Sequence, residues 1–334
     1  MEKPFYVLGF DIGGTKIAIC LGTSDGKLIG STRVGNQDRD PAEVLPELVA
    51  AGKKLLADTG IAESELRAIG IGSPSPMDFE KGIILGPFNM KLWKHVAIRD
   101  YLAEAFGVEA FFDNDANAAC LAEWIFGAGQ NTQNMLYLTM STGIGAGIIA
   151  NGRLLRGKEN YGGEVGHMVL DVNGPVCNCG LRGDYEAFCG GKAIAQRLQE
   201  ELKDKPESAI MKAAGGDVEK IDMRALEIAV REGDAYACKV WDDMIERNAQ
   251  AMGMLMNIFN PEIIALGTIA LRTGDLFMKP LLERVGKYSW KQMNSVCSIV
   301  TSKLDTKIGE YSGVAVALYS LYERGDWQLP WEQQ

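Results

Sequence analysis

Short apolar runs and stretches of helical periodicity alternate along most of the chain. Strand-like runs are expected at residues 67–73, 109–115 and 262–267, and helices at 42–58, 97–106, 116–126, 191–204, 224–232, 236–259 and 313–324. The polar, glycine-broken stretch 203–222 is expected to be a surface loop with short helical parts. Strands that alternate with helices are typical of α/β proteins.

An approximate internal repeat relates residues 7–30 to residues 136–157. Each copy has an apolar strand, a Gly/Thr-rich turn, a second strand rich in Ile, and then a turn signal, Asp25-Gly26 in the first copy and Asn151-Gly152 in the second. Such dipeptides favour hairpin turns that need positive φ. We therefore expect each half of the chain to open with a β-meander; the alternative is a chance likeness between two glycine-rich hairpins.

Length and composition narrow the class of protein. The 334 residues are too many for one ordinary core, so two domains are expected. No apolar run approaches the roughly 20 residues of a membrane span, and the N-terminal residues lack a signal-peptide layout. A net charge of -10 without a basic patch argues against a nucleic-acid binder. Most of the seven cysteines are scattered singly, which indicates a reducing compartment and a cytoplasmic protein.

The first chemical motif is the run from Asp11 to Lys16. Gly13 and Gly14 at a strand-to-strand turn allow backbone N–H groups to approach phosphate oxygens, and Thr15 adds a hydroxyl donor. Lys16 can add positive charge, and Asp11 can hold Mg²⁺ through water. The P-loop pattern is absent. Alone, this motif is equally consistent with a tight hairpin.

The second motif, residues 141–147, is the repeat partner of the first. Two glycine-rich turns related by duplication could hold one polyphosphate from both sides of a cleft. A dinucleotide site is a poorer interpretation because no helical pattern follows directly.

The third motif, residues 113–119, closes an apolar strand and opens an Ala-rich helix. Asp and Asn are good helix caps, and capping alone would explain them. A helix N-terminus also keeps a carboxylate ionised, and an ionised carboxylate beside a substrate hydroxyl could accept its proton.

The fourth motif combines residues 162–167 with residues 177–186. His167 lies ten residues before Cys177, which with Cys179 forms a Cys-x-Cys pair. Thiolates with imidazole suit Zn²⁺, although such cysteines are often only packed in a core. His95 has no such neighbours and is expected to be a surface or packing residue.

Together the runs DIGGTK, NDANAA, STGIGAG and GEVGH…CNCG…YEA, in this order, resemble the ROK family of sugar kinases. The resemblance covers nearly the whole chain. The ROK family is part of the wider actin/hexokinase/Hsp70 superfamily. It implies the two-domain, actin-like ATPase (ribonuclease H-like) α/β fold with a cleft between the domains. The small domain is expected at 1–117 plus 312–334 and the large domain at 118–311.

The resemblance also implies roles for individual residues. Asp115 matches the catalytic base. Sugar contacts are expected from Asn89, Asn114, Glu164, His167, Glu186 and Ser75. Contacts to ATP and its Mg²⁺ are expected from Asp11, Gly13, Gly14, Thr15, Lys16, Thr142, Gly143 and Gly267. Structural Zn²⁺ is expected on His167, Cys177, Cys179 and Asp184.

Several positions depart from the family pattern. Asp184 stands where a third cysteine is usual; Cys189 is an alternative fourth ligand, and a site without metal is another. Ser75 replaces a usual glycine near the sugar, Ser141 stands where glycine is common, and the adenosine turn reads Gly267-Thr268-Ile269.

The expected function is therefore phosphorylation of a glucose-type hexose by ATP, with a sugar and a nucleotide as partners. Fructose, mannose, allose and the N-acetylated hexosamines stay open as substrates, as does a homodimer. A sugar-sensing repressor is disfavoured because the first phosphate motif begins at residue 11, leaving no room for a preceding DNA-binding domain. An ATPase without a sugar substrate does not need the fourth motif, and intact phosphate motifs with Asp115 disfavour a sugar-binding pseudokinase.

Overall fold

The computed structural model describes residues 4–332, which group into two compact units. Within that range, unit 1 takes in the chain up to residue 133, residues 147–162, and the chain from residue 302 onward; unit 2 holds residues 134–146 and 163–301. The domain bounds expected from the sequence assign residues 118–133 to the larger domain and stay a prediction. Residues 1–3 and 333–334 of the expected small domain lie outside the described range.

Unit 1 contains a five-stranded sheet in the order β3-β2-β1-β4-β8. Its strands are β1 (Tyr6–Ile12), β2 (Lys16–Thr23), β3 (Leu28–Gly35), β4 (Leu66–Ser73) and β8 (Ala110–Asn114). The first three form an antiparallel meander, as predicted, and β4 and β8 continue the sheet in parallel with β1.

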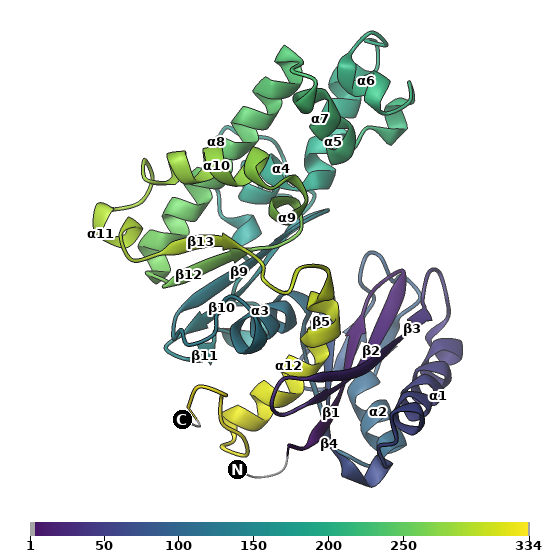
Figure 1. The fold of residues 1–334 in the computed structure, drawn as a ribbon. Helices are drawn as coiled ribbons and strands as arrows, with labels where there is room; N and C mark the ends of the chain where they lie inside the picture. The colour runs from purple at the N-terminus through teal and green to yellow at the C-terminus, as the bar shows by residue number, and fades with distance from the viewer. Residues whose placement is uncertain (1–3, 333–334) are drawn as a thin grey trace. The chain divides into compact units, whose positions relative to one another are not determined.

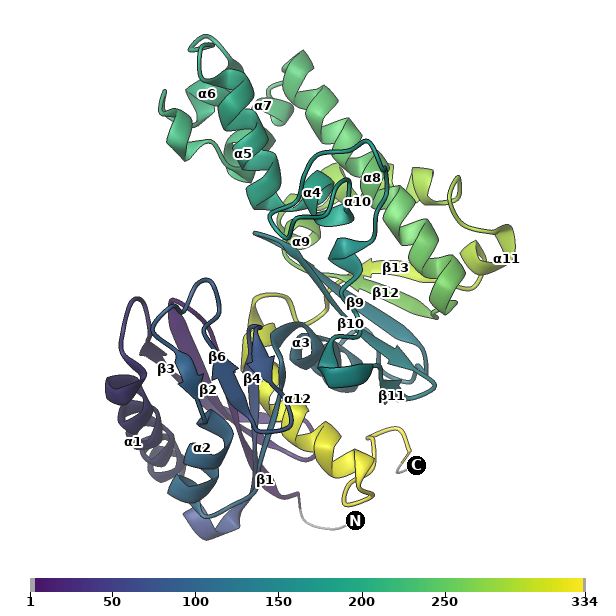
Figure 2. The same ribbon diagram turned by 180° about the vertical axis from the view of Figure 1, so that it is seen from behind.

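Helices cover both faces of this sheet (Figures 1 and 2). On one face α1 (Pro41–Thr59) and α2 (Ile98–Phe106) share a core with Leu8 of β1. On the other, α12 (Ile308–Glu323) lies against Gly9 and packs on α3 (Asp115–Phe126). Neighbouring strand residues point to opposite faces, so this double cover explains why most of β1 is buried.

The second sheet has the order β11-β10-β9-β12-β13. Its strands are β9 (Met135–Met140), β10 (Ile144–Ala150), β11 (Arg153–Leu154), β12 (Ile263–Leu266) and β13 (Ser298–Thr301). The predicted second meander is present, and its turn has positive φ at Asn151 and Gly152. In the first meander only Gly26 has positive φ, because a longer loop runs from Thr23 to Lys27. The turn signal Asp25-Gly26 therefore lies within this longer loop, with positive φ at Gly26 and not at Asp25.

In unit 2 the long helix α8 (Ala235–Phe259) packs against α4 (Tyr185–Cys189), α7 (Met223–Arg231) and α10 (Asp275–Val285). The others are α5 (Gly191–Leu202), α6 (Ala209–Ala213), α9 (Ile269–Thr273) and α11 (Lys291–Asn294). The expected loop at 203–222 holds α6 and a short 3₁₀ turn, η4 (Val218–Lys220). None of the described helices combines the length and the apolar character that a membrane span needs.

The smaller elements complete the chain. A third sheet has the order β5-β6-β7, with β5 (Met77–Asp78), β6 (Ile83–Leu85) and β7 (Lys94–Val96). The remaining 3₁₀ turns are η1 (Glu63–Glu65), η2 (Lys158–Asn160), η3 (Val165–His167) and η5 (Asp305–Lys307).

Candidate functional site

The first glycine turn, between β1 and β2, is held by hydrogen bonds from a buried asparagine. Asn36 donates from its Nδ2 to the carbonyl oxygen of Gly13 at 2.8 Å, and its backbone N–H donates to that of Thr15 at 2.9 Å. A Cβ added at Gly14 would lie 2.6 Å from the backbone oxygen of Asn89. Only glycine therefore lets Asn89, an expected sugar contact, approach an expected phosphate turn.

Asp11 lies near the end of β1 and against Gly309 in the first turn of α12. Burial, and after it the charge of Asp115, raises the pKa of Asp11 to about 7, whereas the charge of Lys16 acts in the opposite direction. The two expected acidic groups of unit 1 are thus close enough to affect each other's charge. A divalent cation would favour the ionised form of both.

Asp115 is exposed at the first position of α3. Asn114 caps this helix by accepting the backbone N–H of Ala116 at 2.9 Å, and it donates from Nδ2 to the hydroxyl of Ser75 at 3.1 Å. The fold thus brings together the predicted base and two predicted sugar contacts. Oδ1 of Asp115 also accepts the backbone N–H of Ala116, at 2.8 Å. Capping and the catalytic interpretation are compatible, because the carboxylate of Asp115 is exposed while it makes this bond.

The second glycine turn, between β9 and β10, meets the start of α5. The carbonyl oxygens of Ser141 and Thr142 accept the first two backbone N–H groups of α5, each at 2.9 Å. Glu186 accepts the backbone N–H of Ile144 at 2.8 Å through Oε2, and a Cβ on Gly143 would collide with the same oxygen. Gly143 is therefore required for the approach of a predicted sugar contact to the second turn.

The four predicted zinc ligands lie together in unit 2. One ligand atom from each of His167, Cys177, Cys179 and Asp184 lies within 4.8 Å of all the others. Oδ2 of Asp184 is 3.0 Å from Nδ1 of His167 and 3.4 Å from Sγ of Cys179. Its Oδ1 accepts the backbone N–H of Ala187 at 2.8 Å and so caps α4.

The charges of this group suit a cation. Burial acts to raise the pKa of Asp184, but hydrogen bonds, that from His167 foremost, hold it below its ordinary value. Burial raises the pKa of the Cys177 thiol to about 12, so a metal would have to displace its proton. The thiol of Cys189 instead contacts the backbone oxygen of Met244 at 3.6 Å. Cys189 is therefore outside the group, and Glu164 lies exposed just before η3.

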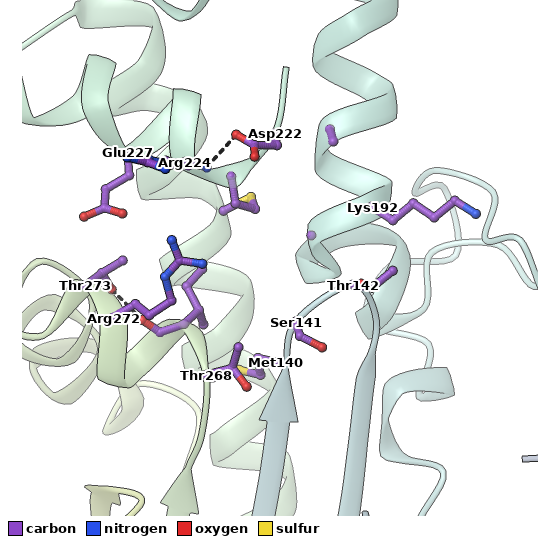
Figure 3. Close-up of a pocket in the computed structure, with 14 residues that line it drawn as sticks. Met140, Ser141, Thr142, Lys192, Asp222, Arg224, Glu227, Thr268, Arg272 and Thr273 are labelled. Carbon is purple, nitrogen blue, oxygen red and sulfur yellow. Dashed lines mark hydrogen bonds between the residues drawn. The ribbon is translucent and has the colours of Figure 1, made fainter. Parts of the chain in front are cut away.

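Unit 2 also contains a cavity of about 550 Å³ beside the second turn (Figure 3). Thr142, Thr268, Met140, Met223, Arg224 and Arg272 are among the residues that line it. Figure 3 shows Arg272 extending from α9 into this space. Within the described part of the chain, the guanidinium groups of Arg224 and Arg272 make no hydrogen bond or ion pair. Gly143 and Gly267 are not lining residues; Gly267 is buried at the end of β12.

Asn36 and the two arginines of the cavity were not predicted from the sequence. Asn36 follows β3, outside the turn to which it donates hydrogen bonds, Arg224 belongs to a helix without a motif, and Arg272 lies three residues after the turn Gly267-Thr268-Ile269. The turn Gly267-Thr268-Ile269, which departs from the family pattern in the sequence, was a usable signal for the cavity wall, because Thr268 and Ile269 line it.

Comparison with known proteins agrees with these motifs. The model of the ROK family matches residues 7–318. A glucokinase of Thermotoga maritima is 36% identical over 89% of this chain and 92% of its own length. A xylose repressor of Caldicellulosiruptor bescii is 29% identical over 89% of this chain and 74% of its own. The crystal structure of a ROK hexokinase from Thermus thermophilus has a TM-score of 0.83 at 31% identity, covering 95% of this chain and 99% of that one.

Proposed function

Since the chain belongs to the ROK family and is an ATP-dependent sugar kinase with the actin-like ATPase fold, we propose that it phosphorylates a hydroxyl of glucose or a glucose-type hexose. The observation that carries this proposal is Asp115, an exposed carboxylate on a capped helix start, next to Asn114 and Ser75. The similarity to a glucokinase makes glucose the first choice among hexoses.

The proposed reaction needs one proton acceptor and much charge neutralisation. Asp115 takes the proton of the attacking sugar hydroxyl while the oxygen of that hydroxyl bonds to the γ-phosphorus. The bond between the γ-phosphorus and the oxygen that bridges it to the β-phosphorus breaks, and ADP is released. Asn89, Asn114 and Ser75 in unit 1, and Glu164, His167 and Glu186 in unit 2, are proposed to bond sugar hydroxyls.

The nucleotide is proposed to use the cavity of unit 2. Its volume of about 550 Å³ is within the usual range for small-molecule sites. Met140 and Met223 offer apolar surface for a base, and Arg224 and Arg272 offer cations whose guanidinium groups make no ion pair with the residues that the structure describes. Thr142 and Gly143, with the turn from Gly13 to Lys16, are the proposed phosphate contacts. Asp11 is proposed to hold Mg²⁺, which would offset phosphate charge.

We also propose a structural Zn²⁺ on His167, Cys177, Cys179 and Asp184. Tetrahedral zinc with bonds of about 2.0–2.3 Å places its ligand atoms roughly 3.3–3.8 Å apart. The observed spread, within 4.8 Å, fits such a centre after small side-chain movements. With Nδ1 of His167 turned toward Asp184, its Nε2 is left for a sugar hydroxyl.

Release of ADP across a panel of sugars tests the proposed substrate. Glucose should give the highest kcat/KM, ahead of mannose, fructose, allose, N-acetylglucosamine and N-acetylmannosamine. A higher value for an N-acetylated hexosamine or fructose would overturn the choice of glucose. The protein could instead bind sugar in calorimetry and release ADP no faster with sugar than without it. That result would favour a sugar sensor, a role that the similarity to a xylose repressor suggests.

The role of Asp115 is tested by Asp115→Asn. Asparagine keeps the size of the side chain but does not accept the proton, so kcat should fall at least about 10²-fold while sugar still binds. Asp100→Asn is a matched control, because Asp100 is an exposed carboxylate in the first turn of α2. Near-normal turnover of a folded Asp115→Asn protein would remove Asp115 from the role of base.

A further inference from the structure

Asp113 is a buried carboxylate that directly precedes Asn114 and Asp115. Its side chain is 1% exposed. Its Oδ1 accepts the backbone N–H of Asn114 at 2.8 Å and the Nδ2 of Asn117 at 2.8 Å. Asn117 belongs to the first turn of α3, so Asp113 is bonded to the chain on both sides of Asp115. One carboxylate therefore fixes the backbone that carries the proposed base.

Arg156, just after β11, holds the other oxygen of Asp113. Its Nε and Nη2 donate to Oδ2 of Asp113 at 3.1 and 2.9 Å, and its Nη1 donates to the carboxylate of Glu323 in α12 at 3.0 Å. The guanidinium also lies 5.3 Å from the ring centroids of both Phe79 and Tyr319. Hydrogen bonds and ring contacts together leave this guanidinium a single orientation.

The segment that carries Arg156 reaches Asp113 a second time. Asn160 donates from Nδ2 to Oδ1 of Asp113 at 3.3 Å. The same segment runs on in the sequence to Glu164 and His167, two of the proposed sugar contacts. Asp113 is therefore the point at which the strand end that leads to Asp115 is bonded to the segment that leads to those contacts.

Stability alone is a weak reason for such a pair. The cost of removing both charges from water largely offsets their attraction, so a buried ion pair adds little net stability. An arginine fork does fix direction, because two N–H groups approach one carboxylate in a set geometry. Here the arginine fixes the orientation of Asp113, and Asp113 in turn fixes the end of β8 and the first turn of α3, on either side of Asp115.

We propose that Arg156 is a positioning residue for phosphoryl transfer, which acts through Asp113 to hold the carboxylate of Asp115 at the attacking hydroxyl. This inference rests on the proposed function, because it takes Asp115 as the base. A misplacement of about 1 Å at a reacting group can cost ~10²-fold in rate. Loss of the fork should therefore lower kcat and leave the binding of sugar and ATP nearly unchanged.

Two variants break the pair from opposite sides. Arg156→Lys keeps the charge without the fork, and Asp113→Asn keeps the shape without the charge. Each should lower kcat about tenfold or more, the size expected for a partial misplacement of the base, with both KM values within about threefold of the parent's. The double variant should lose little more than the worse single variant, because both remove the same link.

Arg324→Lys is the matched control. Arg324 also lies over an aromatic ring, that of Phe111, and pairs with two carboxylates, Glu109 and Asp326, but it does not contact Asp113. Its kcat should stay within twofold of the parent's. Thermal unfolding of every variant checks that the protein assayed is folded.

The outcomes separate this inference from the function on which it rests. Parental kcat in folded Arg156→Lys or Asp113→Asn, with Asp115→Asn inactive, overturns the positioning role alone. An active Asp115→Asn overturns the proposed base and with it the inference. Equal losses of kcat in Arg156→Lys and Arg324→Lys would indicate a general structural effect and also overturn the inference.

If Arg156→Lys does not fold, Glu323→Gln replaces it, because this change weakens the bond that Nη1 of Arg156 donates to Glu323. It should still lower kcat severalfold, and an unchanged kcat counts against the proposal.

Discussion

Asp11 titrates near neutral pH in the folded chain, since its pKa is raised to about 7, chiefly by burial. Between about pH 4 and 7 the folded state keeps a proton that the unfolded state has lost, so this group's contribution to stability falls as pH rises. Asp11→Asn removes that contribution. In urea unfolding without Mg²⁺, the variant should gain stability relative to the parent between pH 5 and pH 8, by on the order of 1–3 kcal/mol.

Asp58→Asn is the control for this pH series, because Asp58 is exposed and pairs with Lys54 on the surface of α1. It should show the parent's pH dependence. Added Mg²⁺ should reduce the difference between Asp11→Asn and the parent at pH 8, because a bound cation favours the ionised carboxylate. The same pH dependence in Asp11→Asn and the parent would show that Asp11 ionises normally.

Thr268 is strained where it meets the cavity of unit 2. Its φ of 49° and ψ of -95° suit glycine and cost a threonine on the order of 1–3 kcal/mol. Thr268→Gly should therefore raise the free energy of unfolding by about 1 kcal/mol, after the greater entropy of unfolded glycine is subtracted. Gly274→Ala, at the other end of α9 with a φ of 56° and open space around it, should instead destabilise by a similar amount. Equal signs for the two changes in urea unfolding would contradict this account.

The types of residue in the site could be predicted from the sequence, but not which of them touch. Gly14 and Asn89 were each predicted, and their contact depends on the path of a loop between distant segments. Glu186 and Gly143 are likewise far apart in sequence and meet through the fold. The sequence around Asn36 does not indicate its role, because its hydrogen bond to Gly13 depends on where the chain after β3 lies in the fold.

At the scale of elements, Asp184 links a helix start to the proposed metal. Its Oδ1 caps α4 and its Oδ2 faces His167 and Cys179. Asp184→Ala should lose zinc and also destabilise the protein by about 1 kcal/mol through the lost cap, whereas Asp184→Asn should keep the cap and bind zinc more weakly. Cys189→Ser should keep one zinc per chain, because its thiol contacts α8.

Metal analysis by mass spectrometry, on protein that has never met a chelator, measures these occupancies, and thermal unfolding measures the cap. Full zinc in Asp184→Ala would exclude Asp184 as a ligand. Active parent protein without zinc would exclude the metal site itself.

The two meanders could be predicted because each repeats the same apolar period and turn signal, and both are present. Helix α10 was not predicted. It begins directly after Gly274, contains Pro280 and follows the short α9. Glycine and proline are signals for a break in a helix, so the local sequence does not show a continuous helical pattern there. Its position against α8 stabilises it despite that weak local preference.

At the scale of the whole molecule, the core of unit 1 needs both ends of the chain. Helix α12 packs on β1 and β4, yet it is the last long helix in the sequence. The α/β class could be predicted from the alternation of elements. The anchoring of residues 302–304, which lead into α12, could not, because that segment has no periodic pattern and its partner, Glu123, resembles any acidic residue on a helix.

Glu123 is fully buried in α3 and accepts several hydrogen bonds from these residues. The backbone N–H of Leu304 donates to it at 2.9 Å and that of Lys303 at 3.2 Å, the hydroxyl of Ser302 also donates, and the N–H of Ala128 adds a bond at 2.8 Å. In Glu123→Gln one of the two oxygens becomes an NH₂ group that would face these donors. We expect unit 1 to lose roughly 2–4 kcal/mol, the range for a buried charged acceptor left partly unpaired.

Urea unfolding followed by tryptophan fluorescence measures this loss, because unit 1 holds Trp93, Trp124, Trp327 and Trp331, whereas unit 2 holds Trp241 and Trp290. Glu262→Gln is the matched control: Glu262 is exposed and accepts the backbone N–H of Asn134 at 2.9 Å, so its loss should stay within about 0.5 kcal/mol. If Glu123→Gln instead unfolds at the parent's midpoint, the bonds to residues 302–304 do not hold α12 in place. The packing of α12 on the sheet would then be sufficient by itself to keep the C-terminal segment in unit 1.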